Sequence, residues 1–179
     1  SLRRQRQMCI RDSGVPYQSV DTWYQRELKT TAEASRNYQK NTYYAGQWRP
    51  EFDRWIDMQA GMFNGDGKKL VAWNSALTYD MVYTQPVVYE FPHLKMPTLL
   101  LIGEQDNTAI GKDTAPEAMR SKLGNYKALG PATAARIPDA TLVTFPDLGH
   151  SPQIQEPERF HKALLDGLLD ADPQGAPSN

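Results

Sequence analysis

Two short apolar runs, each leading to a glycine and then a polar side chain, constrain the fold of this chain most strongly. The first run, Leu99 to Ile102, lies between Pro97 and Gly103, and the second, Leu142 to Phe145, comes shortly before Gly149. Short apolar runs bounded by proline and glycine are typical of buried strands, and the first run lacks the polar alternation of a half-exposed strand. We therefore predict two parallel strands that are covered on both faces.

Two ionisable residues follow these predicted strands, namely Asp106 and His150. In open parallel sheets, ligands bind just beyond the carboxyl ends of the strands. An acid after one strand and a Gly-His pair after the next form the second half of a hydrolase triad. We interpret His150 as a general base and Asp106 as the carboxylate that holds its imidazole in one tautomer. The alternative acids are Glu104, Asp113, Asp139 and Asp147.

The segments from Pro97 to Asp106 and from Gly149 to Phe160 resemble the C-terminal part of the α/β-hydrolase fold. In that family, Pro-Thr-Leu, further apolar residues and Gly-x-x-Asp carry the triad acid, and Gly-His before a Glu-Pro-x-x-Phe helix carries the histidine. The resemblance implies an α/β fold with a helical cap, the last two parallel strands and a closing helix from Glu156 to Leu169. The family's Gly-x-Ser-x-Gly nucleophile motif does not occur in this sequence, so we expect the chain to begin partway through its gene.

The first residues of the chain have a different origin in our interpretation. Residues 3–13 match the translation of a widely used transposase sequencing adapter, and we expect residues 1–13 to be non-native. The whole chain has a formal net charge of −1, and this segment contributes +3, which leaves −4 for the rest. The only cysteine, Cys9, also lies in this segment. The mildly acidic remainder gives no indication of nucleic-acid binding.

Residues 14–92 predict four helices, over about residues 20–28, 30–43, 50–63 and 68–83. Ser19 can cap the first helix, and Thr30 with Glu33 has the spacing of a capping box for the second. Such helices before an acid-bearing strand resemble the lid that many α/β-hydrolases insert between their sixth and seventh strands. Two apolar faces follow from helical spacing. They are Phe52, Trp55, Ile56 and Phe63 in the third helix, and Leu70, Trp73, Leu77 and Met81 in the fourth.

The predicted domains are therefore a helical cap over residues 14–92 and an α/β core over residues 93–170. Residues 171–179, with several proline and glycine residues, predict a disordered tail. Short helices are expected between the strands, from Pro116 to Leu123 and from Pro131 to Arg136. In the closing helix, we expect Phe160, Leu164 and Leu168 to pack against the sheet.

The cap is rich in aromatic residues, which favours a pocket for a small-molecule substrate of apolar or aromatic character. Tyr79, Tyr83 and Trp48 are the candidate substrate-binding residues, and the two tyrosines lie one helical turn apart. Lid tyrosines polarise the ring oxygen in epoxide hydrolases, which this region loosely resembles. Packing within the cap is the alternative interpretation, and we favour it for Trp55 and Trp73.

The sequence predicts no metal and no cofactor. The three histidines are scattered, and we interpret His93 and His161 as structural. No glycine-rich phosphate loop is present. No apolar run approaches the roughly 18 residues that a membrane-spanning helix needs. A cytoplasmic and an exported location both stay open, as does the oligomeric state.

The resemblance implies that the complete enzyme hydrolyses an ester, or a carbon–carbon bond adjacent to a carbonyl, through a Ser-Asp-His triad. Because the serine motif is missing, we expect the isolated chain to be inactive. One alternative is an aspartate nucleophile, as in epoxide hydrolases and haloalkane dehalogenases. Another is a hydrolase scaffold that serves as a non-catalytic binding protein, although the retention of both Asp106 and His150 weighs against it.

Overall fold

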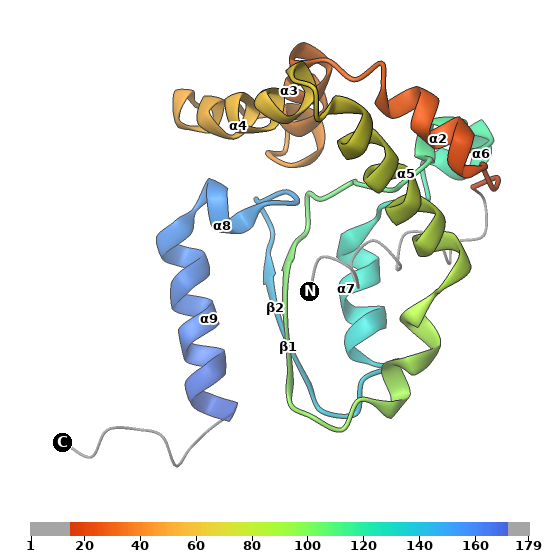
Figure 1. Cartoon of the computed structure of the whole chain (residues 1–179). Helices are drawn as coiled ribbons and strands as arrows, with labels where there is room; N and C mark the ends of the chain where they lie inside the picture. The colour runs from red at the N-terminus through yellow and green to blue at the C-terminus, as the bar shows by residue number, and fades with distance from the viewer. Residues whose placement is uncertain (1–14, 172–179) are drawn as a thin grey trace.

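The computed structural model describes residues 15–171. The adapter-like segment of residues 1–13 and the predicted tail from residue 172 onward lie outside the described residues. In the described chain, residues 15–93 are mostly helical. The helices up to residue 64 lie at one end of a two-stranded sheet, and residues 68–93 run from there toward its other end (Figure 1). We call residues 15–93 the helical layer.

The helical layer contains the four helices predicted from the sequence. They are α2 (Val20–Glu27), α3 (Ala32–Thr42), α4 (Asp53–Asn64) and α5 (Lys68–Thr84), with short 3-10 helices at Pro50–Phe52 and Val87–His93. Ser19 caps α2 as predicted, because its side chain accepts a hydrogen bond from the Thr22 amide. The prediction for α3 was wrong by one residue. Thr31 is the extended residue before the helix, and its hydroxyl accepts from the Ala34 amide at 3.1 Å.

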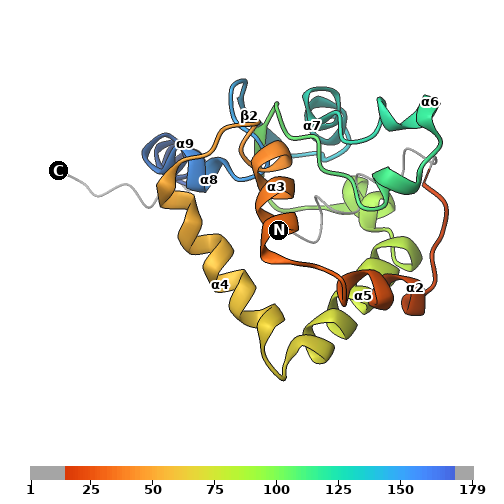
Figure 2. The same cartoon turned by 90° about the horizontal axis from the view of Figure 1, so that it is seen from above.

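The predicted apolar face matches the buried residues in α4 but not in α5. In α4 and the 3-10 turn before it, Phe52, Ile56 and Phe63 are buried as predicted, and Trp55 is half-buried. In α5 the prediction was wrong, because the buried residues are Ala72, Ala76 and Val82. Helix α2 runs beside α5 (Figure 2), and its Trp23 ring lies edge-on to Tyr79 at 5.0 Å. On the predicted apolar face, Leu70 and Leu77 are exposed, at 66% and 42%. Met81 is half-buried, and Trp73, at 40% exposure, lies edge-on to Tyr24 of α2 at 5.6 Å.

The sheet consists of β1 (Thr98–Gly103) and β2 (Ala140–Phe145), which pair in parallel as predicted. Leu100 lies opposite Leu142, and Gly103 lies opposite Phe145, so the carboxyl ends of both strands are level. Helix α7 (Tyr126–Ala134) covers one face and α9 (Pro157–Ala171) the other (Figure 1). The remaining short elements are Lys112–Thr114, α6 (Glu117–Arg120) and α8 (Pro152–Gln155).

The helix between the strands begins earlier than predicted. Helix α7 starts at Tyr126, because Asn125 caps it by accepting a hydrogen bond from the Ala128 amide at 3.3 Å. Pro131, which was predicted to begin this helix, lies inside it. Gly130 faces the sheet, and a β-carbon there would lie 3.5 Å from the Ile102 side chain. The boundary is therefore set by an asparagine cap and not by the proline.

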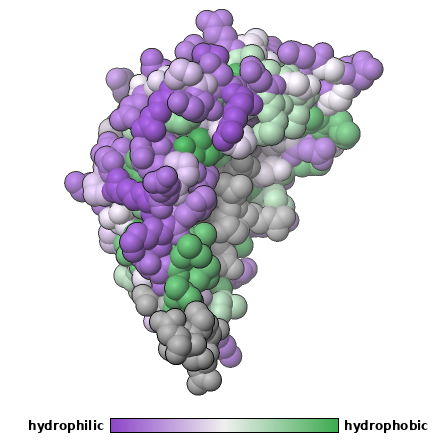
Figure 3. Space-filling view, turned by 90° about the vertical axis from the view of Figure 1, so that its left-hand side faces the viewer, coloured by the Kyte–Doolittle hydropathy of each residue, from purple (hydrophilic) through white to green (hydrophobic). Residues whose placement is uncertain are grey.

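The closing helix contacts the sheet through a glycine. A β-carbon on Gly167 would lie 2.7 Å from the Leu99 side chain, so α9 lies close to β1 at this position. The prediction that Leu168 packs on the sheet was wrong, because the neighbouring Gly167 takes that place and Leu168 is 54% exposed. With Leu165 and Leu169, Leu168 forms an apolar surface near the end of α9 (Figure 3). Phe160 and Leu164 are half-buried, and the Phe160 ring lies 6.2 Å from that of Phe145.

The crossing of two backbone segments at the end of β1 gives a stability prediction. A β-carbon on Gly103 would lie 2.0 Å from the Gly149 carbonyl oxygen and 2.6 Å from that of Leu148. We expect Gly103→Ala to lower the free energy of unfolding by about 3 kcal/mol or more, because backbone atoms must move. Urea denaturation followed by circular dichroism measures this change.

The matched control is Gly61→Ala in the last turn of α4. Nothing lies within 4 Å of a β-carbon at Gly61, so the alanine fits without strain. Replacing a helical glycine in this way should stabilise the protein by about 0.5–1 kcal/mol. Equal unfolding curves for Gly103→Ala and the unmodified chain would contradict the close crossing.

Candidate active site

The turn after β1 places Asp106 in the interior. The strand ends at Gly103, and the Glu104 amide still donates to the Phe145 carbonyl at 2.9 Å. The Gln105 amide then donates to the Leu148 carbonyl at 2.9 Å, which ties the turn to the loop that carries His150. The Asp106 amide donates back to the Gly103 carbonyl at 3.2 Å. As a result, Asp106 is buried, with 4% of its surface exposed.

Both oxygens of the buried Asp106 carboxylate have partners. Oδ1 accepts a hydrogen bond from the Thr108 amide at 2.8 Å, and Oδ2 lies 2.7 Å from Nδ1 of His150. Buried carboxylates need such partners to offset the loss of water. A neutral imidazole that donates Nδ1–H to Asp106 has Nε2 available as a proton acceptor. The pair can therefore act as an oriented base.

A glycine and a buried glutamine shape the loop that presents His150. The Gly149 amide donates to the Gln155 side-chain oxygen at 2.7 Å, and Gln155 is 2% exposed. A β-carbon on Gly149 would lie 2.5 Å from the Tyr43 carbonyl oxygen, so no larger residue fits without a shift. The same Tyr43 carbonyl accepts from the Ser151 amide at 3.2 Å, and the Tyr43 ring lies 4.5 Å from the His150 ring.

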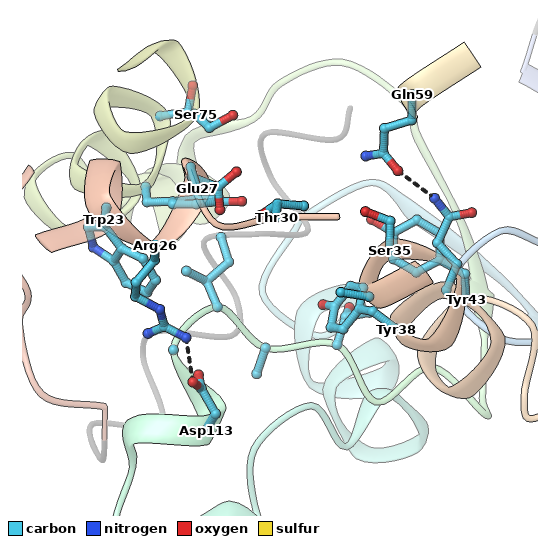
Figure 4. Close-up of a pocket in the computed structure, with 18 of the residues that line it drawn as sticks. Trp23, Arg26, Glu27, Thr30, Ser35, Tyr38, Tyr43, Gln59, Ser75 and Asp113 are labelled. Atoms are coloured by element: carbon cyan, nitrogen blue, oxygen red, sulfur yellow. Dashed lines mark hydrogen bonds and ion pairs between the residues drawn. The ribbon is translucent and has the colours of Figure 1, made fainter. Parts of the chain in front are cut away.

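A cavity of about 760 Å³ lies between the helical layer and the ends of the strands. Helices α2, α3, α4 and α5 and the residues next to them form one part of its wall (Figure 4). The α/β part contributes Thr108, Ala109, Ile110, Gly111, Asp113, Tyr126 and His150. The lining includes the charged residues Arg26, Glu27 and Asp113 beside aromatic ones. No local motif marks Gln155, Arg26 or Glu27, so the sequence did not predict that they belong to the site.

The three predicted substrate-binding residues occupy different places. Tyr79 lines the cavity, and its ring lies edge-on to Trp23 at 5.0 Å. Tyr83 and Trp48 are not among the lining residues. The Tyr83 hydroxyl is buried without a hydrogen-bond partner among the described residues, and burial raises its pKa to about 12. Trp48 packs edge-on to Phe52, and its indole nitrogen donates to Asp53 at 3.1 Å.

Two of the alternative acids have partners of their own. Asp147 is exposed and accepts hydrogen bonds from Arg159 at 2.8 and 2.9 Å, and these bonds lower the pKa of its carboxyl group. Asp113 forms an ion pair with Arg26.

Within residues 15–171, no group of three His, Cys, Asp or Glu side chains could hold a metal ion. Over the same residues, no helix is both long and apolar enough to cross a membrane.

Two solved structures are similar to this chain. The chain is 70% identical to a probable hydrolytic enzyme from Pseudomonas aeruginosa PAO1, with a TM-score of 0.85 over 87% of this chain and 50% of that one. It also matches an α/β hydrolase from a Medee basin deep-sea metagenome library, at 20% identity and a TM-score of 0.51. The match covers 89% of this chain and 51% of that chain.

The chain has the fold of the C-terminal part of an α/β hydrolase. It spans about half the length of both hydrolase structures. Protein-family models and curated proteins gave no match. The two parallel strands with α7 and α9 on their faces therefore form part of an α/β-hydrolase sheet, as the sequence resemblance implied.

The hydrogen bond between Asp106 and His150 gives a spectroscopic prediction. The neutral His150 ring should carry its proton on Nδ1, because Asp106 Oδ2 accepts from that atom. Asp106→Asn should weaken this preference and move the ring toward a mixture of tautomers. Two-bond ¹H–¹⁵N correlation spectra of labelled histidine measure the tautomer directly.

Asp147→Asn is the matched control for this measurement. Asp147 lies on the same loop as His150, but its carboxylate is exposed and bonded to Arg159. Its replacement should leave the His150 spectrum unchanged. A spectrum that responds to Asp147→Asn and not to Asp106→Asn would be inconsistent with this hydrogen bond.

Proposed function

We propose that this chain supplies the acid and base of an α/β-hydrolase triad, with Asp106 and His150 as its catalytic residues. The complete enzyme would hydrolyse an ester, or a carbon–carbon bond adjacent to a carbonyl. The observation that carries the proposal is the 2.7 Å contact between the buried Asp106 carboxylate and His150, whose ring lines the cavity. The likeness to a probable hydrolytic enzyme supports the same reaction class.

In the proposed reaction, Nε2 of His150 takes the proton of a serine hydroxyl as that oxygen attacks the substrate carbonyl. The same nitrogen then returns the proton to the leaving group. Asp106 keeps the ring in the required tautomer and stabilises the imidazolium. The serine and the oxyanion donors come from outside this chain, so the chain alone should show no triad-dependent turnover.

In this proposal, the helical layer is the lid of the enzyme. The domain division would then be a cap over residues 14–92 and an α/β core over residues 93–170. Two contacts to the loop and short helix after β2 support this role. Arg49 donates to the Gln155 carbonyl at 3.0 Å and pairs with Glu156 at 2.6 Å. A lid held over the base excludes water from the reacting groups.

The test is a chimera in which residues 15–171 replace the matching half of the Pseudomonas hydrolytic enzyme. Because 70% of the aligned residues are identical, the two halves should assemble. We expect hydrolysis of short-chain nitrophenyl esters, and His150→Ala should lower kcat by roughly 10³-fold or more. Asp106→Asn should lower kcat by a similar factor through the wrong histidine tautomer.

His161→Ala is the control, since His161 is an exposed residue of α9. Its kcat should equal that of the unmodified chimera. A folded chimera whose ester hydrolysis survives His150→Ala would refute the triad assignment. Turnover of an epoxide or a haloalkane, with no ester hydrolysis, would instead favour an aspartate nucleophile.

A further inference from the structure

A carboxylate faces the cavity from the helical layer. Glu27 is the last residue of α2, lines the cavity and points into it (Figure 4). Its side chain is hydrogen-bonded to Tyr79, which lines the cavity from α5. Burial raises the pKa of Glu27, while the Tyr79 hydrogen bond and the charge of Arg26 lower it in part. The fold therefore keeps a partly desolvated acid at this place, and the proposed triad does not use it.

Several hydrogen-bond donors near Glu27 are engaged within the protein. Arg26 donates to Asp113 through one terminal nitrogen and to the Gln18 side chain through the other, the latter at 3.3 Å. On α5, the Asn74 amide donates to the Leu70 carbonyl at 3.0 Å, and the Thr78 hydroxyl donates to the Asn74 carbonyl at 2.8 Å. Both α5 residues line the cavity. These donors are therefore already used. The Ser75 and Thr30 hydroxyls of the same wall can accept as well as donate, and the buried Trp23 indole N–H has no hydrogen-bond partner among the described residues.

The charge of the lining favours the same kind of ligand. Besides His150, the ionisable acids and bases that line the cavity are Arg26, Glu27 and Asp113. Two carboxylates against one guanidinium give this wall a formal charge of −1 with His150 neutral. The Arg26 guanidinium is already paired with Asp113 and also lies over the Trp23 ring at 4.9 Å. An anionic ligand would meet net repulsion here, and a cation would meet net attraction.

We infer that the α2–α5 side of the cavity binds a primary ammonium group, with the Glu27 carboxylate as its counter-ion. An ammonium carries three donors, no acceptor and one positive charge, which suits a wall that has a formal charge of −1 and a carboxylate facing the cavity. This inference rests on the proposed function, because it makes the substrate an ester or ketone with an amine remote from the reacting carbonyl. His150 lies beside Tyr43 at the end of α3, on a different wall from Glu27.

The test compares three ligands of similar size, namely phenylpropylamine, phenylpropanol and phenylpropionate. Calorimetric titration of the full chain at neutral pH should show the amine binding about tenfold more tightly than the alcohol, and the acid most weakly. Glu27→Gln keeps the shape of the side chain and removes its charge, so the amine preference should fall to about twofold or less. Glu33→Gln is the control, because Glu33 is an exposed residue of α3 outside the cavity lining.

The same titrations on the chimera make the result independent of how the isolated chain behaves. Glu27→Ala serves as a second variant in case the glutamine binds a ligand through its own amide. Equal affinities for the three ligands, tightest binding of the acid, or an amine preference that survives both variants would overturn the inference. Loss of ester hydrolysis with a retained amine preference would count against the proposed triad and leave the ammonium site standing.

Discussion

The level ends of the two parallel strands are the constraint on which the site depends. Gly103 lies opposite Phe145, and the backbone after each strand crosses the other so closely that Gly103 has no room for a side chain. This crossing leads Asp106 and His150, 44 residues apart in sequence, to a 2.7 Å contact. A slip of one residue in the register would move one of them away from this edge of the sheet. The acid–base geometry is therefore a property of strand pairing.

Much of this arrangement could be predicted from local sequence. The apolar run from Leu99 to Ile102 and the cap at Ser19 are decided by neighbouring residues, and the structure confirms the strand and the helix. The parallel pairing also follows from the sequence, because continuous apolar runs suit a sheet covered on both faces. The segments around Asp106 and His150 resemble the α/β-hydrolase family, and this resemblance predicted the fold. The two similar solved structures confirm that fold.

Other features depend on tertiary contacts that no local pattern encodes. Helix α5 offers two apolar faces, and its tertiary contacts bury Ala72 and Ala76 while Leu70 and Leu77 stay exposed. Gly167 displaces Leu168 from the sheet, since the shortest side chain allows a close approach. Glu27 and Tyr79 are 52 residues apart in sequence and meet only because α2 and α5 lie side by side. Aromatic content predicted an apolar pocket, whereas the lining also carries charged and amide groups that become neighbours only on folding.

The outward position of Leu70 and Leu77 has a practical consequence. Because α5 holds its place in the helical layer through Ala72, Ala76 and Val82, its outer side chains contribute little to packing. Glutamate or lysine has a helix propensity close to that of leucine, so hydrophilic replacements there conserve the helix. The outer surface of α5 is thus available for solubility engineering without disturbing the cavity beneath it.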